Sequence, residues 1–368
     1  MSNHNITKPT LLVDIERVRT NIKRMSEKAQ RNNVEFRPHF KTHQSAEIGE
    51  IFREFGVNKI TVTTVEMAEY FAQHGWSDIT IAMPVNLREI DKINELTSIA
   101  PLGLIVDSEF SSKFLSENIF NKVNIWIEIN AGYNRSGVIN DSISEILRIT
   151  EIIRNSQKLK LSGILSHFGN TYSAKSLEDV QNIFADSHIK MQKVRILLES
   201  KFGSEFKISV GDTPSCSILE DFGQVDEIRP GNFVFYDLMQ LNIGACTEKD
   251  IAVTLACPVI SKNSEKNEIV LYGGAIHLSK EYIIYNGRKC FGAITTLNAK
   301  SWCKIIQNAF VKSISQEHAV VNAPESLLKT VEIGDLLGII PVHSCLTANL
   351  MRKYLTTDDR IIEMAKFR

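Results

Sequence analysis

The sequence predicts an α/β protein in which a (β/α)8 TIM-like barrel is followed by a C-terminal antiparallel β-domain. Short β-branched runs alternate with amphipathic segments from residue 10 to about residue 231, which is the rhythm of βα units. After about residue 244, strand-like runs separated by polar turns replace the helical patterns. We therefore expect a barrel domain at residues 10–244 and a β-domain at residues 245–368, with residues 1–9 packed against the β-domain.

The barrel is expected to contain eight strands, each a short run of β-branched and apolar residues bounded by turn-forming or charged residues. The runs are Thr10–Val13, Val34–Arg37, Lys59–Thr63, Ile79–Met83, Leu102–Val106, Val123–Ile129, Leu161–Ser166 and Phe206–Val210, with Asp226–Arg229 as a ninth short element. Eight parallel strands joined by crossover helices can close into a barrel that leaves no strand edge exposed.

One intervening helix is predicted at Asp14–Gln30. Asp14 suits the N-cap position, and an apolar stripe at three- and four-residue spacing follows it, formed by Val18, Ile22, Met25 and Ala29. This helix should lie against the outside of the barrel.

The β-domain is expected to contain strands at Ala252–Ile260, Glu268–Tyr272, Tyr282–Asn286 and Val331–His343. Ser261–Asn267 is a polar turn, and Asn286-Gly287 is a strong hairpin signal.

Charge and cysteine content restrict the function to small-molecule chemistry. The 42 basic and 43 acidic side chains nearly cancel, so no long-range field attracts nucleic acid or an anionic membrane. The six cysteines show no paired spacing and are expected to be reduced thiols. The first ten residues lack the apolar core of a signal peptide, and no apolar run approaches the roughly 20 residues of a membrane span, so we expect a cytoplasmic protein.

Polar and glycine-rich segments follow several predicted strands, where the catalytic groups of such barrels lie. Arg37-Pro-His-Phe-Lys41-Thr-His43 contains the sharpest candidate. An amine beside cationic or desolvating neighbours such as Arg37, His39 and His43 has its pKa lowered toward the range in which it forms Schiff bases. Residue type alone favours the alternative of a solvated loop lysine.

Two further segments on this rim suggest a cofactor site. Gly211-Asp-Thr-Pro-Ser215 offers backbone N–H groups, a hydroxyl and a helix start, which together suit a phosphate. A simple βα turn with Ser215 as N-cap explains the same pattern. Tyr172 could stack on an aromatic cofactor or deliver a proton, or it could serve packing alone.

His343 and Cys345 suggest a metal site in the β-domain. If the strand begun near Val331 continues, the two residues stand at i and i+2 on one strand face. An imidazole and a thiolate suit Zn²⁺, and two protein ligands leave positions open for water and substrate. Spacing alone favours the alternative of a buried cysteine next to an exposed histidine.

An ordered set of motifs resembles the D-threonine aldolase and D-serine dehydratase family, whose fold is similar to that of alanine racemase. These motifs run over nearly the whole chain in the family's order and are Arg37–His43, Asn134–Gly137, His167–Gly169, Gly211–Pro214, Glu227–Tyr236, Ser315–His318 and His343–Thr347. The resemblance implies two cofactors, pyridoxal 5'-phosphate and Zn²⁺ or another divalent metal. It also implies a D-amino acid substrate and a homodimer.

The resemblance also implies roles for single residues. Lys41 would carry pyridoxal phosphate and act as a catalytic residue, and His343 and Cys345 would be the catalytic metal ligands. The residues that would contact the cofactor are His167, Tyr172, Gly211, Asp212, Thr213 and Tyr236.

Cys345 favours the dehydratase branch, because the aldolase branch tends to carry aspartate at that position. The implied reaction converts D-serine or D-threonine into a 2-oxo acid and ammonia. Retro-aldol cleavage to glycine and an aldehyde is the alternative, and an amino-acid racemase is a more distant one. Gln44 stands where the family commonly has lysine, and the roles of Glu317 and His318 stay open.

Overall fold

The computed structural model describes residues 6–298 and 301–367. The chain forms two compact units. We call the first the sheet unit, which comprises Met1–Ile22, Thr42–Ile48 and Asn232–Lys366. The second, the barrel unit, comprises Lys23–Lys41, Gly49–Gly231 and Phe367–Arg368.

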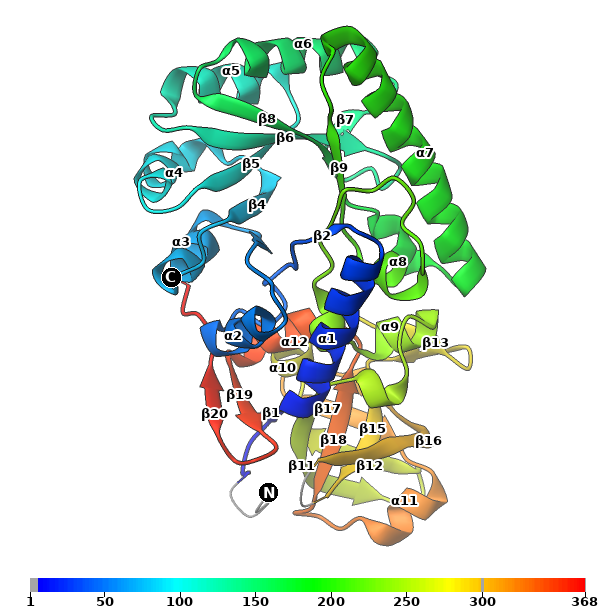
Figure 1. The fold of residues 1–368 in the computed structure, drawn as a ribbon. Helices are drawn as coiled ribbons and strands as arrows, with labels where there is room; N and C mark the ends of the chain where they lie inside the picture. Colours follow the sequence, from blue (N-terminus) through cyan, green and yellow to red (C-terminus); the bar gives the residue numbers. More distant parts are fainter. Residues whose placement is uncertain (1–5, 299–300, 368) are drawn as a thin grey trace. The chain divides into compact units, whose positions relative to one another are not determined.

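The barrel unit is built on a curled sheet of parallel strands (Figure 1). In spatial order these are β2 (Glu35–Phe36), β10 (Glu227–Ile228), β9 (Lys207–Val210), β8 (Leu159–Ser166), β6 (Val123–Asn130), β5 (Leu102–Val106), β4 (Ile79–Pro84) and β3 (Ile60–Val62). A parallel bridge between His39, just after β2, and Thr61 of β3 links the two ends of this order. Seven of the eight expected barrel strands lie in this sheet, and the short element near residue 227 takes the remaining place in this order. A further strand, β7 (Val138–Ile139), pairs with β6.

Helices alternate with these strands, as a parallel sheet requires. They are α3 (Val65–Gln73), α4 (Ile90–Thr97), α5 (Glu109–Asn118), α6 (Ile143–Asn155), α7 (Leu177–Phe202) and α8 (Thr213–Ile218), while α1 (Ile15–Arg31) and α2 (Ala46–Glu54) each have residues in both units. Helix α1 begins as predicted, because Asp14 Oδ1 accepts a hydrogen bond from Arg17 N at 3.1 Å. Its predicted apolar stripe is buried.

The sheet unit contains a nine-stranded sheet and short helices. The strand order is β12 (Glu268–Tyr272), β17 (His318–Asn322), β16 (Trp302–Ile314), β15 (Gly292–Leu297), β18 (Leu336–Pro341), β11 (Val253–Asn263), β1 (Thr10–Val13), β19 (Lys353–Thr356) and β20 (Ile361–Glu363). The helices are α9 (Leu238–Ile243), α10 (Ala275–Leu278), α11 (Glu325–Thr330) and α12 (Ser344–Met351). Pairing is antiparallel throughout except between β1 and β19.

A separate hairpin in the sheet unit confirms one turn prediction. Strands β13 (Ile283–Tyr285) and β14 (Arg288–Cys290) pair antiparallel around Asn286 and Gly287. Both turn residues have positive φ, 49° and 73°, which is the geometry that an Asn-Gly pair adopts readily.

Two predicted strands were wrong in part. Thr10–Val13 is a strand, but it pairs with β11 in the sheet unit and not within the barrel. A buried apolar run carries no information about which sheet receives it. The strand expected at Val331–His343 begins at Leu336 and ends at Pro341, so His343 lies beyond it.

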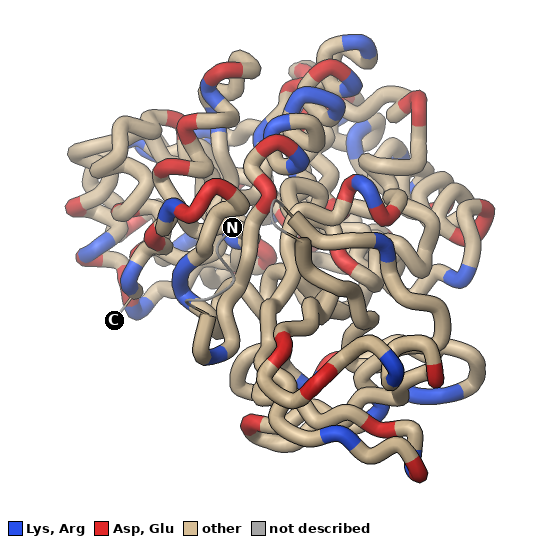
Figure 2. The backbone as a smooth tube through the Cα atoms, turned by 90° about the horizontal axis from the view of Figure 1, so that it is seen from below, with Lys and Arg blue, Asp and Glu red and all other residues tan. Residues whose placement is uncertain are grey.

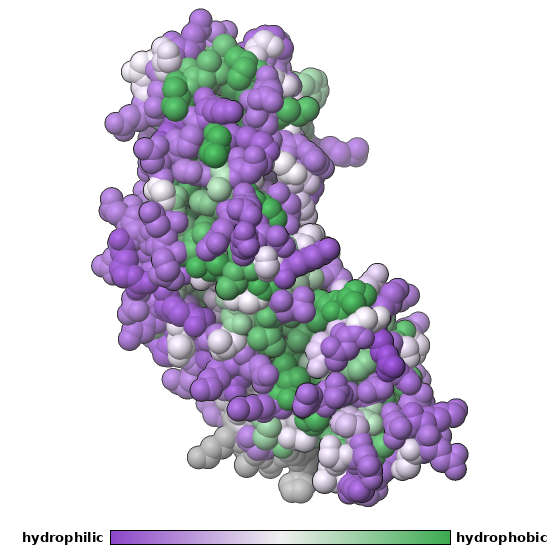
Figure 3. All heavy atoms as spheres, turned by 90° about the vertical axis from the view of Figure 1, so that its right-hand side faces the viewer, coloured by the Kyte–Doolittle hydropathy of each residue, from purple (hydrophilic) through white to green (hydrophobic). Residues whose placement is uncertain are grey.

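Lysine, arginine, aspartate and glutamate are interspersed along the chain (Figure 2), and polar side chains separate the apolar patches on the face drawn in Figure 3. All six cysteines are free thiols. Within residues 6–298 and 301–367, no helix is long and apolar enough to cross a membrane.

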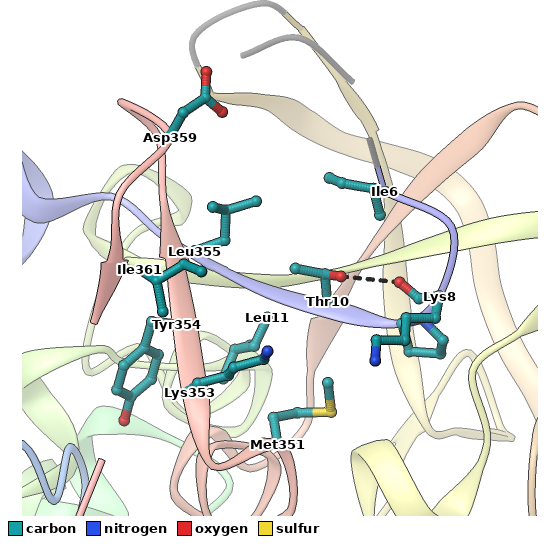
Figure 4. A pocket seen from close by; sticks show the side chains of 11 residues that line it. Ile6, Lys8, Thr10, Leu11, Met351, Lys353, Tyr354, Leu355, Asp359 and Ile361 are labelled. Carbon is teal, nitrogen blue, oxygen red and sulfur yellow. Dashed lines mark hydrogen bonds between the residues drawn. The ribbon is translucent and has the colours of Figure 1, made fainter. Parts of the chain in front are cut away.

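A cavity of about 380 Å³ lies in the sheet unit (Figure 4). Its walls come from β1 and the residues before it, the end of α12, and the β19–β20 hairpin, and include Leu11, Met351 and Leu355. None of the predicted site residues is among its lining residues.

An aromatic cluster anchors the segment that leads to Lys41. The Phe40 side chain is fully buried, and its ring centroid lies 4.8 Å from that of Phe52 and 5.0 Å from those of Phe71 and Trp76. The residue before Lys41 is thus fixed in the core of the barrel unit.

We expect Phe40→Ala to lower the free energy of unfolding by about 3–5 kcal/mol, because it leaves a cavity among three rings. Urea denaturation followed by tryptophan fluorescence would measure the change. Phe110→Ala is the matched control, since Phe110 is 71% exposed and its loss should matter by less than about 0.5 kcal/mol. Equal midpoints for the two variants would contradict the prediction.

Candidate active site

The segment after β2 carries Lys41 and a neutral histidine. The backbone N–H of Lys41 donates to His39 Nδ1 at 3.3 Å. Burial, together with the positive charges of Lys41, Arg229 and Arg135, lowers the pKa of His39 well below its ordinary value. The imidazole is therefore uncharged at neutral pH and can accept this hydrogen bond.

A second neutral histidine follows β8. His167 Nδ1 hydrogen-bonds the carbonyl oxygen of Gly211. Burial, with the nearby charges of Lys41 and Arg135, lowers the pKa of His167 to about 3. Because a carbonyl can only accept, Nδ1 must carry the proton, and Nε2 keeps its lone pair.

Two residues expected to flank Lys41 are engaged elsewhere. The guanidinium of Arg37 is bound by Glu227 Oε2 at 2.7 Å and Asp78 Oδ1 at 2.5 Å. These carboxylates raise the pKa of Arg37 despite the opposing effect of burial. His43 is buried in the sheet unit, where its Nδ1 meets the backbone of Ser45. Of the three expected neighbours, the structure brings His39 to Lys41.

The loop after β9 has the features of a phosphate site. Asp212 caps α8 by accepting from Ser215 N at 2.7 Å, and it also accepts from Thr171 Oγ1 at 3.0 Å. Burial raises the pKa of Asp212 to about 6. Tyr172 Oη accepts from Thr213 N at 3.3 Å, so the predicted Tyr172 and Gly211–Thr213 lie together.

A hydroxyl group of this loop fits a phosphate as ligand. Thr213 Oγ1 is buried and has no hydrogen-bond partner among the described residues, while the buried Ser215 side chain lies beside the Asp212 carboxylate. A buried hydroxyl without a partner is costly, and a phosphate would satisfy Thr213 as acceptor. The cationic Lys41, Arg135 and Arg229, which together depress the pKa of His39, give the region the positive potential that a phosphorylated cofactor requires.

Sequence reasoning missed two charged residues in this region. Arg229 is 6% exposed and donates to Ser209 Oγ at 3.0 Å and to Ser166 O at 2.9 Å. Burial lowers its pKa to about 10, which leaves it cationic at neutral pH. Burial also raises the pKa of Glu128, whose Oε2 has no partner within the described part of the chain. Both residues stand at or just after strand ends, which is the signal that could have identified them.

His343 and Cys345 lie close together because both stand at the start of a helix, and not because they share a strand face. His343 is the N-cap of α12, and Cys345 lies in the first turn of that helix. The His343 side chain hydrogen-bonds Cys345, and its Nδ1 lies 3.1 Å from Glu281 Oε2. The predicted pair is confirmed as a spatial pair, although the geometry expected for it was wrong.

Two donors hold the sulfur of Cys345 in place. Thr42 Oγ1 lies 3.2 Å from Cys345 Sγ, and Asn232 Nδ2 lies 3.6 Å from it. Both groups can donate to a thiolate. The thiolate is the form that binds a metal ion.

The buried carboxylate of Asp237 organises the same site. It accepts from Asn232 Nδ2 at 2.5 Å, Ser344 N at 2.9 Å and Ser344 Oγ at 3.2 Å, and its other oxygen caps α9 through Gln240 N at 3.0 Å. Burial raises the pKa of Asp237, while His343 and these donors favour its charged form. The start of α12, and with it Cys345, is fixed from this side.

The electrostatics of His343 fit a metal ligand. Burial alone would lower the pKa of His343, but Cys345, Glu281 and Asp237 raise it to about 11. Such an anionic setting favours a cation. No group of three or more His, Cys, Asp or Glu residues suited to a metal occurs in the described ranges. If a metal binds here, His343 and Cys345 would supply one nitrogen and one sulfur ligand.

The remaining predicted residues lie in the sheet unit. Tyr236 is buried and has a positive φ of 48°. Glu317 and His318 are exposed at the turn between β16 and β17. Gln44 Nε2 donates to Asn349 Oδ1 at 3.3 Å, so it is engaged in packing against α12.

Two family models match the chain. The model for the alanine racemase N-terminal domain matches residues 13–238, and that for a serine dehydratase domain matches residues 252–357. The first covers more than half of the 368 residues.

Relatives of known activity match over nearly full length. The D-serine dehydratase of Dictyostelium discoideum is 28% identical, over 99% of this chain and 97% of its own. The D-threo-3-hydroxyaspartate dehydratase of Delftia sp. HT23 is 25% identical in its solved structure, with a TM-score of 0.89 and 99% of each chain covered. The D-threonine aldolase of Filomicrobium marinum, at 20% identity and a TM-score of 0.83, shares the fold. The chain therefore belongs to the alanine racemase N-terminal domain family, with a serine dehydratase domain in its C-terminal part.

Proposed function

We propose that the protein is a lyase dependent on pyridoxal phosphate and a divalent metal, and that it dehydrates D-serine or D-threonine to a 2-oxo acid and ammonia. The observation that carries this proposal is the His343–Cys345 pair, on a chain whose barrel unit holds Lys41 beside a phosphate-type loop. Relatives named D-serine dehydratase and D-threo-3-hydroxyaspartate dehydratase support the substrate class.

Lys41 would hold the cofactor through its side-chain amine, and this amine in its free form would remove the α-proton of the substrate. Pyridoxal phosphate supplies the electron sink that makes this proton acidic. The hydroxyl of Thr213 binds the phosphate group, with Gly211, Asp212 and Tyr172 forming the loop around it. His167 and Tyr236 complete the set of residues assigned to the cofactor.

His343 and Cys345 hold the metal. The metal supplies a Lewis acid for the β-hydroxyl, which is otherwise a poor leaving group. Imidazole nitrogen and thiolate sulfur favour Zn²⁺. Removal of the α-proton and loss of hydroxide from the β-carbon, followed by hydrolysis, convert D-serine into pyruvate and ammonia.

Cleavage of the Cα–Cβ bond is the second candidate reaction. It would give glycine and an aldehyde from the same substrates, with the β-hydroxyl losing its proton. Cys345 favours dehydration, because the aldolase branch of the resembled family tends to have aspartate at that position. A racemase would need a second acid and base in place of a metal pair. We also propose that the protein is a cytoplasmic homodimer.

Incubation of the holoenzyme with D-serine or D-threonine should give a 2-oxo acid, and a metal chelator should abolish the product. Assaying 2-oxo acid, glycine and aldehyde in the same samples separates the reactions. Glycine and aldehyde would assign the protein to the aldolase reaction, and turnover that resists the chelator would contradict the metal.

Lys41→Ala should remove the yellow absorption of the lysine-bound cofactor and reduce activity by several orders of magnitude, because no other group replaces the amine. Absorption spectroscopy after cofactor loading measures the band. Lys92→Ala, which alters an exposed lysine on α4, is the control and should retain it. Persistence of the band in the Lys41 variant would reject this lysine.

Thr213→Val should weaken pyridoxal phosphate binding about 10- to 100-fold, since a hydrogen bond to a charged group contributes about 1.5–3 kcal/mol. Equilibrium dialysis of the cofactor gives the affinity. Thr254→Val is a closely matched control, because Thr254 Oγ1 is also buried without a described partner but lies on β11 of the sheet unit. Equal cofactor affinities in the two variants would exclude Thr213 from the phosphate site.

A further inference from the structure

A carboxylate that sequence reasoning did not single out contacts the proposed metal ligand. Glu281 Oε2 lies 3.1 Å from His343 Nδ1. A carboxylate at neutral pH only accepts hydrogen bonds. His343 Nδ1 must then carry the proton, and Nε2 is left as the nitrogen that can bind a metal.

The loop that carries Glu281 is fixed on one side by the turn between β16 and β17. Gly273 N donates to Glu317 O at 2.8 Å, and Ala275 N donates to Ser315 O at 2.8 Å. The approach is so close at Gly274 that a Cβ would lie 2.3 Å from Gln316 O. Glu317 thus supports this loop through its backbone.

The same loop is anchored immediately before and after Glu281. Leu278 is buried, and its carbonyl accepts from Thr347 Oγ1 of α12 at 3.5 Å. On the other side, the Tyr282 ring packs on Phe291 at a centroid distance of 5.7 Å and on Lys289 Nζ at 4.4 Å. The residues on both sides of Glu281 are therefore held by contacts, which limits the positions that its carboxylate can take relative to His343.

We propose that Glu281 is a positioning residue of the metal site, holding His343 in the tautomer and ring orientation that direct Nε2 at the ion. This inference rests on the proposed function, because it requires His343 to be a metal ligand. Carboxylates that hold a ligating histidine in this way typically contribute 10- to 100-fold to metal affinity. Cys345 also contacts Thr42 and Asn232, which do not touch Glu281, so the loss of Glu281 should act mainly through the nitrogen ligand.

The test measures metal affinity in the cofactor-loaded, metal-stripped protein. Zn²⁺ is titrated against a chromophoric chelator in the unmodified protein and in Glu281→Ala, Glu281→Gln and His343→Ala. We expect Glu281→Ala to weaken binding about 10- to 100-fold. Glu281→Gln should weaken it less, because the amide oxygen still accepts from Nδ1. Glu265→Gln removes a charge from the exposed β11–β12 turn and should leave the affinity unchanged.

A second readout, the absorption of bound Co²⁺, separates positioning from coordination. The thiolate-to-cobalt band and the d–d bands should keep their positions in Glu281→Gln. Unchanged Zn²⁺ affinity in Glu281→Ala would overturn the inference. It would also be overturned if the d–d bands of Glu281→Gln shifted as far as those of His343→Ala, because Glu281 would then be a metal ligand. If His343→Ala itself binds Zn²⁺ as tightly as the unmodified protein, the proposed metal site fails and the role of Glu281 fails with it.

Discussion

A buried carboxylate, Glu227, holds the catalytic end of the barrel unit together. Its two oxygens accept from Arg37 of the segment after β2 and from Ser209 of β9, each at 2.7 Å, and Ser209 Oγ in turn accepts from Arg229. Removing one partner of a buried pair typically costs about 3–5 kcal/mol, because the other charge is left without compensation. These hydrogen bonds therefore hold β2, β9 and β10 in register. They also hold the Arg229 guanidinium in the region of Lys41.

Asp237 has the corresponding role in the sheet unit. Four hydrogen bonds reach this one carboxylate, from the segment before α9, from α9 itself and from the first residue of α12. In each unit a buried carboxylate accepts hydrogen bonds from several helices and strands and so fixes their ends relative to one another. Leaving any of these buried donors unpaired would be costly. His343 and Cys345, the proposed metal ligands, lie directly beside the Asp237 network.

The sequence predicted seven of the eight barrel strands, since hydrophobic period and turn residues are local signals. Thr10–Val13 was assigned to the wrong sheet, because the local pattern of a buried apolar strand does not determine which sheet it joins. The sequence pattern also predicted His343 and Cys345 on a strand, although a helix begins at Ser344. Glu281 could not be predicted, because its partner is 62 residues away and only the fold brings the two together. The roles assigned to Lys41 and the cofactor residues stay predictions.

The two histidines of the barrel unit have a consequence for how the site responds to acid. The pKa of His167 is lowered to about 3, and that of His39 also falls well below its ordinary value. Histidine is the side chain that ordinarily changes charge near neutral pH. Here the group that titrates close to neutrality is the Asp212 carboxyl, whose pKa burial raises to about 6. Moderate acidification would therefore neutralise this carboxylate and strengthen the attraction of the site for anions.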